Sequence, residues 1–123
     1  MVLFKSYKSE YADGEQKRDF IYVKDAVDIV MYFLKHPDLN GIYNVGTGQA
    51  RSWNELSGAL FAAVGKPPYV EYIDMPTDMR PRYQYFTQAD MNKLRESGYA
   101  QAFTSLGSAV KDYVSYLKTG SYI

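Results

Sequence analysis

The chain has 123 residues, a length that forms at most one ordinary domain, and no apolar run reaches the ~20 residues that span a membrane. Lys plus Arg and Asp plus Glu are 14 each, so the zero net charge gives no field that would attract nucleic acid or an anionic membrane. The absence of cysteine excludes disulfides, thiolate zinc sites and a cysteine nucleophile, and it is typical of a cytoplasmic protein.

Strands and helices alternate in the first part of the chain. Residues 1–7 are a candidate edge strand, and residues 18–23 end in an uninterrupted run of β-formers. Asp25 is a candidate N-terminal residue of a helix, and Pro37 marks where that helix ends. The apolar residues on one predicted face of this helix are Ala26, Ile29, Val30, Phe33 and Leu34.

A second strand–turn–helix unit follows. Residues 42–45 are predicted to form a short buried strand, and residues 46–48, Gly-Thr-Gly, a tight turn after it. Ser52 and Glu55 have the spacing of a capping box, which opens a helix that Gly65 ends in a left-handed cap. This alternation of strand and helix favours an α/β fold with some parallel pairing.

The last third continues with a strand at residues 70–73 and an arginine- and proline-containing loop at residues 75–82. A short helix near Asp90 stops at Gly98, and a final helix opens at Thr104 or Ser105. The residues of this final helix that we expect to face inward are Leu106, Val110, Tyr113, Val114 and Leu117.

These elements predict one domain at residues 1–118 and a frayed tail at residues 119–123. Three short strands make only a thin sheet, whereas parallel sheets are normally covered on both faces. We therefore expect that the chain is a fragment of a larger fold, and that the rest of the sheet lies in an N-terminal portion outside it.

The glycine turn at residues 46–48 differs from a dinucleotide-binding loop, because Arg51 stands where the fingerprint needs its third glycine. No tyrosine has a lysine four positions later, the pair that lets a phenol act as an acid or base near neutral pH. We therefore expect no catalytic residue, no cofactor-binding residue and no metal ligand in this chain.

Three arginines are candidate phosphate ligands, because a guanidinium presents a planar fork of donors that matches phosphate oxygens. Arg18 opens a predicted strand, and Arg80 and Arg82 flank a proline in the loop before Tyr83. Two of these segments could hold a pyrophosphate between them. The alternative is that all three arginines are solvated surface charges or form ordinary salt bridges, since exposed arginines are the norm.

Aromatic and hydroxyl side chains accompany these arginines. Tyr83, Tyr85 and Phe86 form a cluster that could stack on a base or bond a phosphate, and core packing is the alternative. Residues 5–7, Lys-Ser-Tyr, offer a charge and two hydroxyls at a strand end. The only histidine, His36, falls at a helix C-terminus and is assigned no catalytic role.

Four segments carry a resemblance to a known family: residues 13–25, with Arg-Asp-Phe-Ile-Tyr-Val, residues 41–48, with Asn-Val-Gly-Thr-Gly, residues 82–90, Arg-Tyr-Gln-Tyr-Phe-Thr-Gln-Ala-Asp, and residues 3–6, Leu-Phe-Lys-Ser. They resemble the NAD(P)-dependent sugar-nucleotide epimerases and dehydratases of the extended short-chain dehydrogenase/reductase family. The third string is most similar to members that act on an ADP-linked heptose. The resemblance covers nearly the whole chain but corresponds to only about the C-terminal third of the family's usual length.

The resemblance implies the substrate-binding portion of an extended Rossmann-type fold, in an NADP-dependent epimerase that inverts C6 of ADP-heptose by transient oxidation and reduction. It places the reaction in the synthesis of the lipopolysaccharide core. The family's glycine-rich loop and Tyr-x-x-x-Lys pair have no counterpart here, so we expect this segment alone to hold no NADP and to be inactive. The substrate-binding residues that the resemblance implies are Phe4, Lys5, Ser6, Tyr7, Arg18 at the pyrophosphate, Tyr83 at the nucleotide end, and, as secondary candidates, Arg82 and Arg80.

Two other functions remain open from the sequence. The 13 tyrosines could form the surface of a non-catalytic binding or assembly module, including a homo-oligomer. The two commoner motifs do not fix the sugar, so the chain could also belong to a different sugar-nucleotide epimerase or dehydratase.

Overall fold

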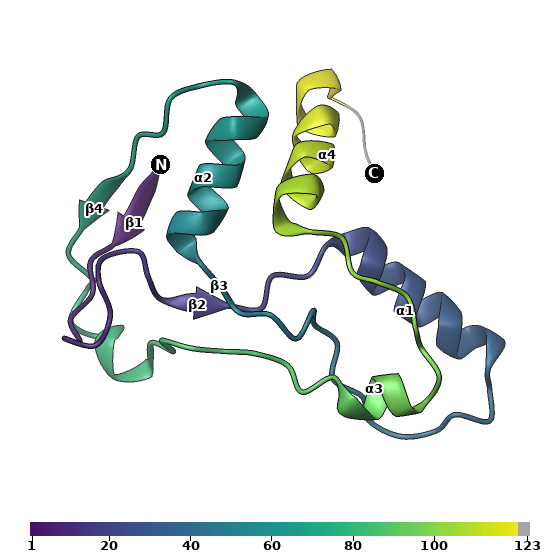
Figure 1. Ribbon diagram of the computed structural model, residues 1–123. Coiled ribbons are helices and arrows are strands. Elements are labelled where there is room, and N and C mark those ends of the chain that lie inside the picture. The colour runs from purple at the N-terminus through teal and green to yellow at the C-terminus, as the bar shows by residue number, and fades with distance from the viewer. Residues whose placement is uncertain (121–123) are drawn as a thin grey trace.

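The computed structural model describes residues 1–120 and shows a mixed α/β arrangement (Figure 1). The strands are β1 (Val2–Phe4), β2 (Lys17–Arg18), β3 (Arg51–Ser52) and β4 (Glu71–Ile73). The helices are α1 (Val23–Lys35), α2 (Trp53–Val64), α3 (Asn92–Glu96) and α4 (Leu106–Thr119), with a 3₁₀ turn η1 (Arg80–Arg82). The predicted α/β class is therefore confirmed.

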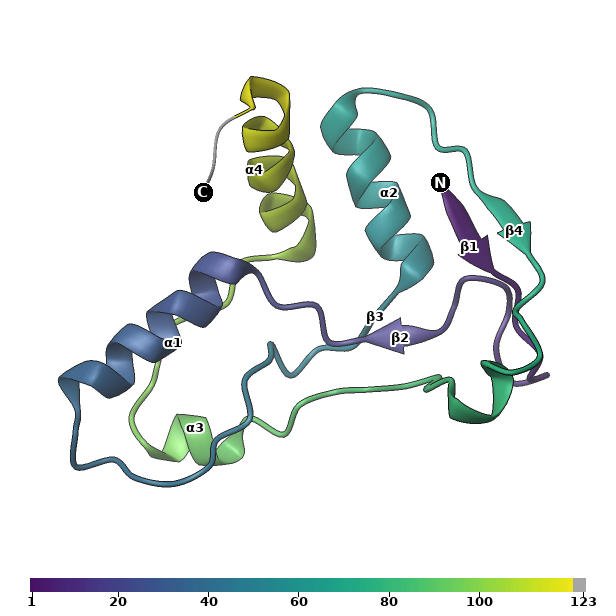
Figure 2. The same cartoon turned by 180° about the vertical axis from the view of Figure 1, so that it is seen from behind.

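The elements gather at two ends of the molecule. β1 pairs in parallel with β4, so that Val2 lies opposite Glu71, and this small sheet lies with η1 at one end (Figure 1). Helices α1 and α3 lie at the other end, and α2 and α4 stand side by side in both views (Figure 2). β2 and β3 pair antiparallel between the two ends. Among the described residues, no helix has the length and apolar composition needed to cross a bilayer.

Both ends of α2 and the start of α4 follow the capping signals of the sequence, whereas Tyr22 and not Asp25 precedes α1. The Ser52 hydroxyl accepts from the Glu55 amide at 3.2 Å, and the Glu55 carboxylate accepts from the Ser52 amide at 2.7 Å. Gly65 ends α2 in the left-handed conformation, with φ of 70°, and Ser105 caps α4. Thr119, the first residue of the predicted tail, belongs to helix α4. Residues 121–123 of that tail lie outside the described residues.

Two predicted strands are wrong. Strand pairing stops after Arg18, and α1 already begins at Val23, two residues before Asp25. The Asp19 carboxylate accepts hydrogen bonds from backbone amides of other segments. These side-chain hydrogen bonds take the place of the backbone hydrogen bonds that a strand at residues 19–23 would make. Residues 42–45 also pair with no strand among the described residues, and Ile42 is 89% exposed.

The core lies between α1 and α3. It is built from Ile29, Met91, Leu94 and Tyr99, and Phe33 packs against it. The buried Asp25 carboxylate accepts from the amide and the hydroxyl of Thr104 at 2.8 and 2.7 Å, which fixes the chain just before α4 against α1. The residues that we expected to face inward but that are exposed are Val30 and Leu34 on α1 and Tyr113 and Leu117 on α4.

The glycine turn forms a cradle for the carboxylate of Asp19. This carboxylate accepts from the amide of Thr47 at 2.8 Å, from its hydroxyl, from the amide of Gly48 at 2.9 Å and from the amide of Ala89 at 3.0 Å. A Cβ at Gly46 would lie 2.6 Å from the Asp19 oxygen and 2.6 Å from the Ala89 Cβ. Glycine is therefore needed at position 46 because the carboxylate fills the space.

These hydrogen bonds also set the protonation of Asp19. Burial alone raises the pKa of this carboxyl, but the bonds from Thr47, Ala89 and Gly48 stabilise the charged form more strongly, and the net pKa lies below its usual 3.8. A lowered native-state pKa stabilises the fold above the unfolded-state pKa of about 3.9, and this contribution is lost as the pH falls through the native-state pKa.

We predict that Asp19→Asn lowers the free energy of unfolding by about 1–3 kcal/mol near neutral pH. The side-chain nitrogen of the asparagine would face backbone N–H groups that donate to the carboxylate in the parent chain. The variant should also lose less stability than the parent on acidification from about pH 7 to about pH 3. Urea unfolding at both pH values measures this, and Asp78→Asn at an exposed position is the control. Equal acid sensitivity of parent and Asp19→Asn would contradict the assignment.

Candidate functional site

A short parallel contact brings together the two segments that carry the candidate site. The Lys17 amide donates to the Tyr85 carbonyl at 2.8 Å, and the Thr87 amide donates to the Lys17 carbonyl at 3.2 Å. The segment after η1 therefore runs beside β2, although the two are almost 70 residues apart in sequence. This pairing positions Tyr83 next to Arg18.

Arg18 and Tyr83 are in direct contact. The Arg18 guanidinium lies 5.2 Å from the centre of the Tyr83 ring, within the range of a cation–π interaction, and Phe4 meets the same ring edge-on at 6.4 Å. Arg18 donates one hydrogen bond, to the Lys17 carbonyl at 2.8 Å, and forms no ion pair with a carboxylate of residues 1–120. Most of its five N–H donors thus remain available for an anion.

Tyr85 holds the β1–β2 loop against this contact. It is 5% exposed, and its hydroxyl accepts from the Tyr7 amide at 2.9 Å and from the Ser6 hydroxyl at 3.2 Å. Its ring meets those of Tyr7 and Tyr83 at 5.2 and 5.5 Å. For Tyr85 the structure favours the packing alternative over stacking on a ligand, and a pattern of residue types could not show that this phenol is the buried one.

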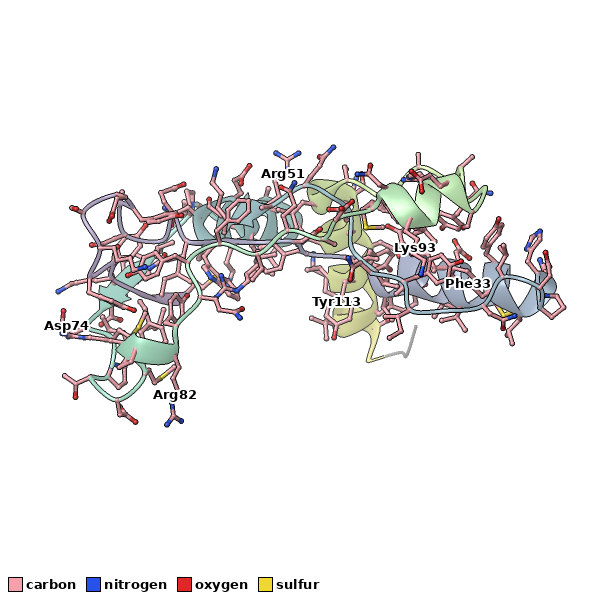
Figure 3. All side chains as sticks on the ribbon, turned by 90° about the horizontal axis from the view of Figure 1, so that it is seen from below. Phe33, Arg51, Asp74, Arg82, Lys93 and Tyr113 are labelled. Carbon is pink, nitrogen blue, oxygen red and sulfur yellow. The ribbon has the colours of Figure 1, made fainter. Side chains whose placement is uncertain are left out.

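Arg80 reaches the same cluster from η1. Its guanidinium lies 5.8 Å from the Tyr7 ring and its Nε donates to the Met75 carbonyl at 3.1 Å, while the Tyr7 hydroxyl donates to the Arg80 carbonyl. Figure 3 shows Arg82 extending away from the ribbon, and its exposed side chain contacts no partner in the described part of the chain. Phe4, Ser6, Tyr7, Arg18, Arg80 and Tyr83 are thus linked by contacts, and Arg82 lies outside this group.

Lys5 lies at the edge of the group. Its ammonium pairs with Asp74 at 3.2 Å, and both side chains are largely exposed, at 46% and 79%. An exposed pair of this kind contributes little to stability, so Lys5 can exchange its partner for an anionic ligand at small cost. The roles in substrate binding stay predictions for all eight of these residues.

A cavity of about 290 Å³ adjoins Phe4 and Tyr83. Its other walls include Gln16 and Trp53, and it is almost entirely apolar. Gln16 is 1% exposed and donates to the Phe4 carbonyl at 3.4 Å, whereas its Oε1 and the Trp53 Nε1 have no partner in residues 1–120. No sequence signal marks Gln16 as buried, because glutamine is mostly exposed.

The glycine turn leaves no cradle for a cofactor phosphate. Its Thr47 and Gly48 amides, the groups that would bind a pyrophosphate, both donate to the Asp19 carboxylate. These two amides therefore already have an anionic partner within the chain. No group of three His, Asp or Glu side chains among the described residues could hold a metal ion.

A second group of lysine and tyrosine side chains, centred on Lys24, lies between α1 and α4 and apart from the Arg18–Tyr83 contact. Lys24 donates to Asp112 at 2.8 Å and to the Tyr116 hydroxyl at 2.9 Å, and the Tyr22 hydroxyl donates to the same Asp112 carboxylate. The hydrogen bond to Asp112 is the main reason why the pKa values of both Lys24 and Tyr22 are raised. These hydrogen bonds tie the start of α1 to α4.

A family model and curated relatives of this chain point to the same family. The family model of the NAD dependent epimerase/dehydratase family matches residues 5–46. ADP-L-glycero-D-manno-heptose-6-epimerase of Nitratidesulfovibrio vulgaris strain DP4 is 52% identical over 114 residues, which are 93% of this chain and 35% of that protein. The chain therefore spans about a third of the length of the curated relatives it matches.

Solved structures of the same kind share the fold. The Helicobacter pylori ADP-L-glycero-D-manno-heptose-6-epimerase is 33% identical, with a TM-score of 0.68 over 85% of this chain and 30% of that one. The Thermus thermophilus UDP-glucose 4-epimerase, solved with NAD, is 25% identical, with a TM-score of 0.77 over 96% of this chain and 35% of that one.

The fold is therefore that of the extended short-chain dehydrogenase/reductase epimerases. The chain belongs to the NAD-dependent epimerase/dehydratase family, and it corresponds to the C-terminal portion of ADP-L-glycero-D-manno-heptose-6-epimerases.

We predict that Tyr85→Phe lowers the free energy of unfolding by about 1–2 kcal/mol, because the Tyr7 amide and the Ser6 hydroxyl lose their shared acceptor. Tyr69→Phe, at a side chain that is 71% exposed, should change it by less than about 0.5 kcal/mol. Urea unfolding followed by circular dichroism compares the two variants. Equal stability of both would show that the Tyr85 hydroxyl does not hold the β1–β2 loop.

Proposed function

We propose that this chain is the substrate-binding portion of an NADP-dependent epimerase that inverts C6 of ADP-D-glycero-D-manno-heptose to the L-glycero form, a step in making the lipopolysaccharide core. The observation that carries the proposal is the contact between Arg18 and Tyr83, in a chain 52% identical to a heptose epimerase over 93% of its length. Both residues lie in the segments that carry the family resemblance.

In this proposal Arg18 binds the diphosphate of the substrate. Its guanidinium already lies against a ring and lacks a carboxylate partner in residues 1–120, so phosphate oxygens can accept its N–H donors without first breaking an ion pair. Tyr83 and Phe4 form the aromatic wall for the nucleotide end beside the 290 Å³ cavity. Ser6 and Tyr7, held by Tyr85, line the same side of the site.

Lys5 lines the substrate site in this proposal, and Arg80 and Arg82 act as secondary ligands. The Arg80 guanidinium lies 5.8 Å from the Tyr7 ring, and Lys5 pairs with Asp74 at the edge of the group. The Arg82 side chain extends away from the ribbon (Figure 3).

We assign the cofactor to a polypeptide equivalent to the N-terminal portion of the relatives. Supporting this, the Thr47 and Gly48 amides of the glycine turn, which could bind a pyrophosphate, already donate to the Asp19 carboxylate. NADP supplies the redox chemistry when that portion is present, and the residues described above bind and orient the substrate. The segment alone is then inactive, and a cytoplasmic location fits a cysteine-free chain.

We predict that Arg18→Ala weakens the binding of ADP-heptose by about 1.5–3 kcal/mol, the usual range for hydrogen bonds to a charged group. Titration calorimetry of the chain with ADP-heptose and with ADP measures this, and Lys66→Ala, which removes one exposed positive charge away from the site, is the matched control.

Both ligands should lose affinity for Arg18→Ala by a similar factor, because they share the diphosphate. Unchanged affinity would remove Arg18 from the site. Tighter binding of UDP-glucose than of ADP-heptose by the parent chain would favour another sugar-nucleotide enzyme of the same family.

A further inference from the structure

The loop between β1 and β2, residues 5–16, carries Lys5, Ser6 and Tyr7 and is held to the start of α2. A helix leaves its first backbone N–H groups without partners inside the helix. In α2 two of these groups donate to the loop: the Trp53 amide to the Gln16 carbonyl at 3.3 Å, and the next amide along the helix to a loop carbonyl at 3.1 Å. The loop therefore completes the hydrogen bonding of this helix end.

The Asn54 side chain binds the same loop. Its Nδ2 donates to the Asp13 carbonyl at 2.9 Å and to the Glu15 carboxylate at 2.6 Å, and its Oδ1 accepts from the Tyr72 hydroxyl at 2.9 Å. Both amide protons and the amide oxygen are thus used, and Tyr72 of β4 fixes the orientation of the amide. A Cβ at Gly14 would lie 2.6 Å from the Asn54 Cγ, so glycine at this position lets the loop backbone approach the amide closely.

Asp13 connects this anchor to Ser6. Its backbone carbonyl accepts from Asn54, while its carboxylate accepts from the Ser6 amide at 2.7 Å. The neighbouring Tyr7 amide donates to the Tyr85 hydroxyl at 2.9 Å. The backbone of Ser6 and Tyr7 is therefore held from two sides, by Tyr85 on one and by Asp13 with Asn54 on the other. Because the loop is already ordered, ligand binding does not carry the entropy cost of ordering it.

We propose that Asn54 and Asp13 are positioning residues of the nucleotide-sugar site. They keep the β1–β2 loop in the conformation in which Ser6 and Tyr7 line the site, and they act through the loop rather than by touching the substrate. The part of the loop in binding rests on the proposed function, whereas the anchor itself rests on the hydrogen bonds described above.

The physical basis is the population of the binding-competent loop. When that conformation is only partly populated, the apparent dissociation constant rises by the inverse of its population. Loss of the anchor should therefore weaken binding although no group that contacts the ligand has changed.

Two simpler roles predict different results. If Asp13 acted only through its negative charge, removing the charge would strengthen the binding of a diphosphate whatever residue replaced it. If Asn54 only stabilised the fold as a whole, its loss would speed hydrogen exchange in the core as well as in the loop.

The test compares the parent chain with Asn54→Ala by hydrogen exchange and by titration calorimetry with ADP-heptose. We expect exchange at the Ser6 amide to become at least about tenfold faster, while exchange at Ile29 in the core stays unchanged. The dissociation constant for ADP-heptose should rise about three- to tenfold, because the loop is then ordered for only part of the time.

Asn92→Ala, at an exposed asparagine in the first turn of α3, is the matched control and should change neither quantity. Alanine is a good helix former, and far-UV circular dichroism checks that α2 remains folded in Asn54→Ala.

Asp13 allows a test by conservative replacement. Asp13→Asn keeps a side-chain oxygen that can accept from the Ser6 amide, whereas Asp13→Ala removes it. We expect Asp13→Asn to bind ADP-heptose within about twofold of the parent and Asp13→Ala to bind it at least about threefold more weakly. Tighter binding by both variants would show that only the charge of Asp13 matters, and would overturn its assignment.

The outcomes separate this inference from the proposed function. Faster exchange at Ser6 in Asn54→Ala with unchanged affinity for ADP-heptose would overturn the positioning role and leave the proposed function intact. Unchanged exchange at Ser6 would overturn the anchor. Failure of the parent chain to bind ADP-heptose or ADP, with exchange at Ser6 still faster in Asn54→Ala, would contradict the proposed function and support the anchor alone.

Discussion

The carboxylate of Asp19 joins three segments that lie far apart in the chain. It follows β2 directly, and its oxygens hold the turn at Thr47 and Gly48 and the backbone at Ala89. The segment from η1 to α3 is thus fixed beside β2 at two points. The first is the pairing of Lys17 with Tyr85 and Thr87, and the second is the bond from Ala89 to Asp19. Because Arg18 lies between these two points, its position against Tyr83 depends on both.

Local signals predicted the helices well and the strands poorly. The capping box at Ser52, the left-handed cap at Gly65 and the cap at Ser105 depend on a few neighbouring residues, and the structure confirms all three. Strand pairing depends on distant partners, which no local pattern reveals. Residues 18–23 were misassigned because the Asp19 side chain takes the amides of other segments, and residues 42–45 because their β-formers find no neighbour in residues 1–120.

The residues of the candidate site also fall into those that the sequence could name and those that it could not. Arg18 and Tyr83 could be named from the sequence because they stand in recognisable strings, and the structure brings them to 5.2 Å. The parts played by Tyr85 and Asp19 could not, since a phenol that is 5% exposed and a carboxylate with several amide donors look like any other Tyr and Asp in one sequence. Residues that bind ligands and residues that hold them in place therefore differ in how visible they are to sequence reasoning.

The contact between Asp19 and Gly46 also limits how this sequence can change. Any side chain at position 46 would overlap the carboxylate oxygen and the Ala89 methyl, whereas a residue without a side-chain acceptor at position 19 would leave three amide donors unpaired. Neither position can mutate alone without a penalty. A lineage of such proteins should thus accept a change at either position only together with changes at the residues it contacts, Ala89 included, so that these positions would be inherited as a group.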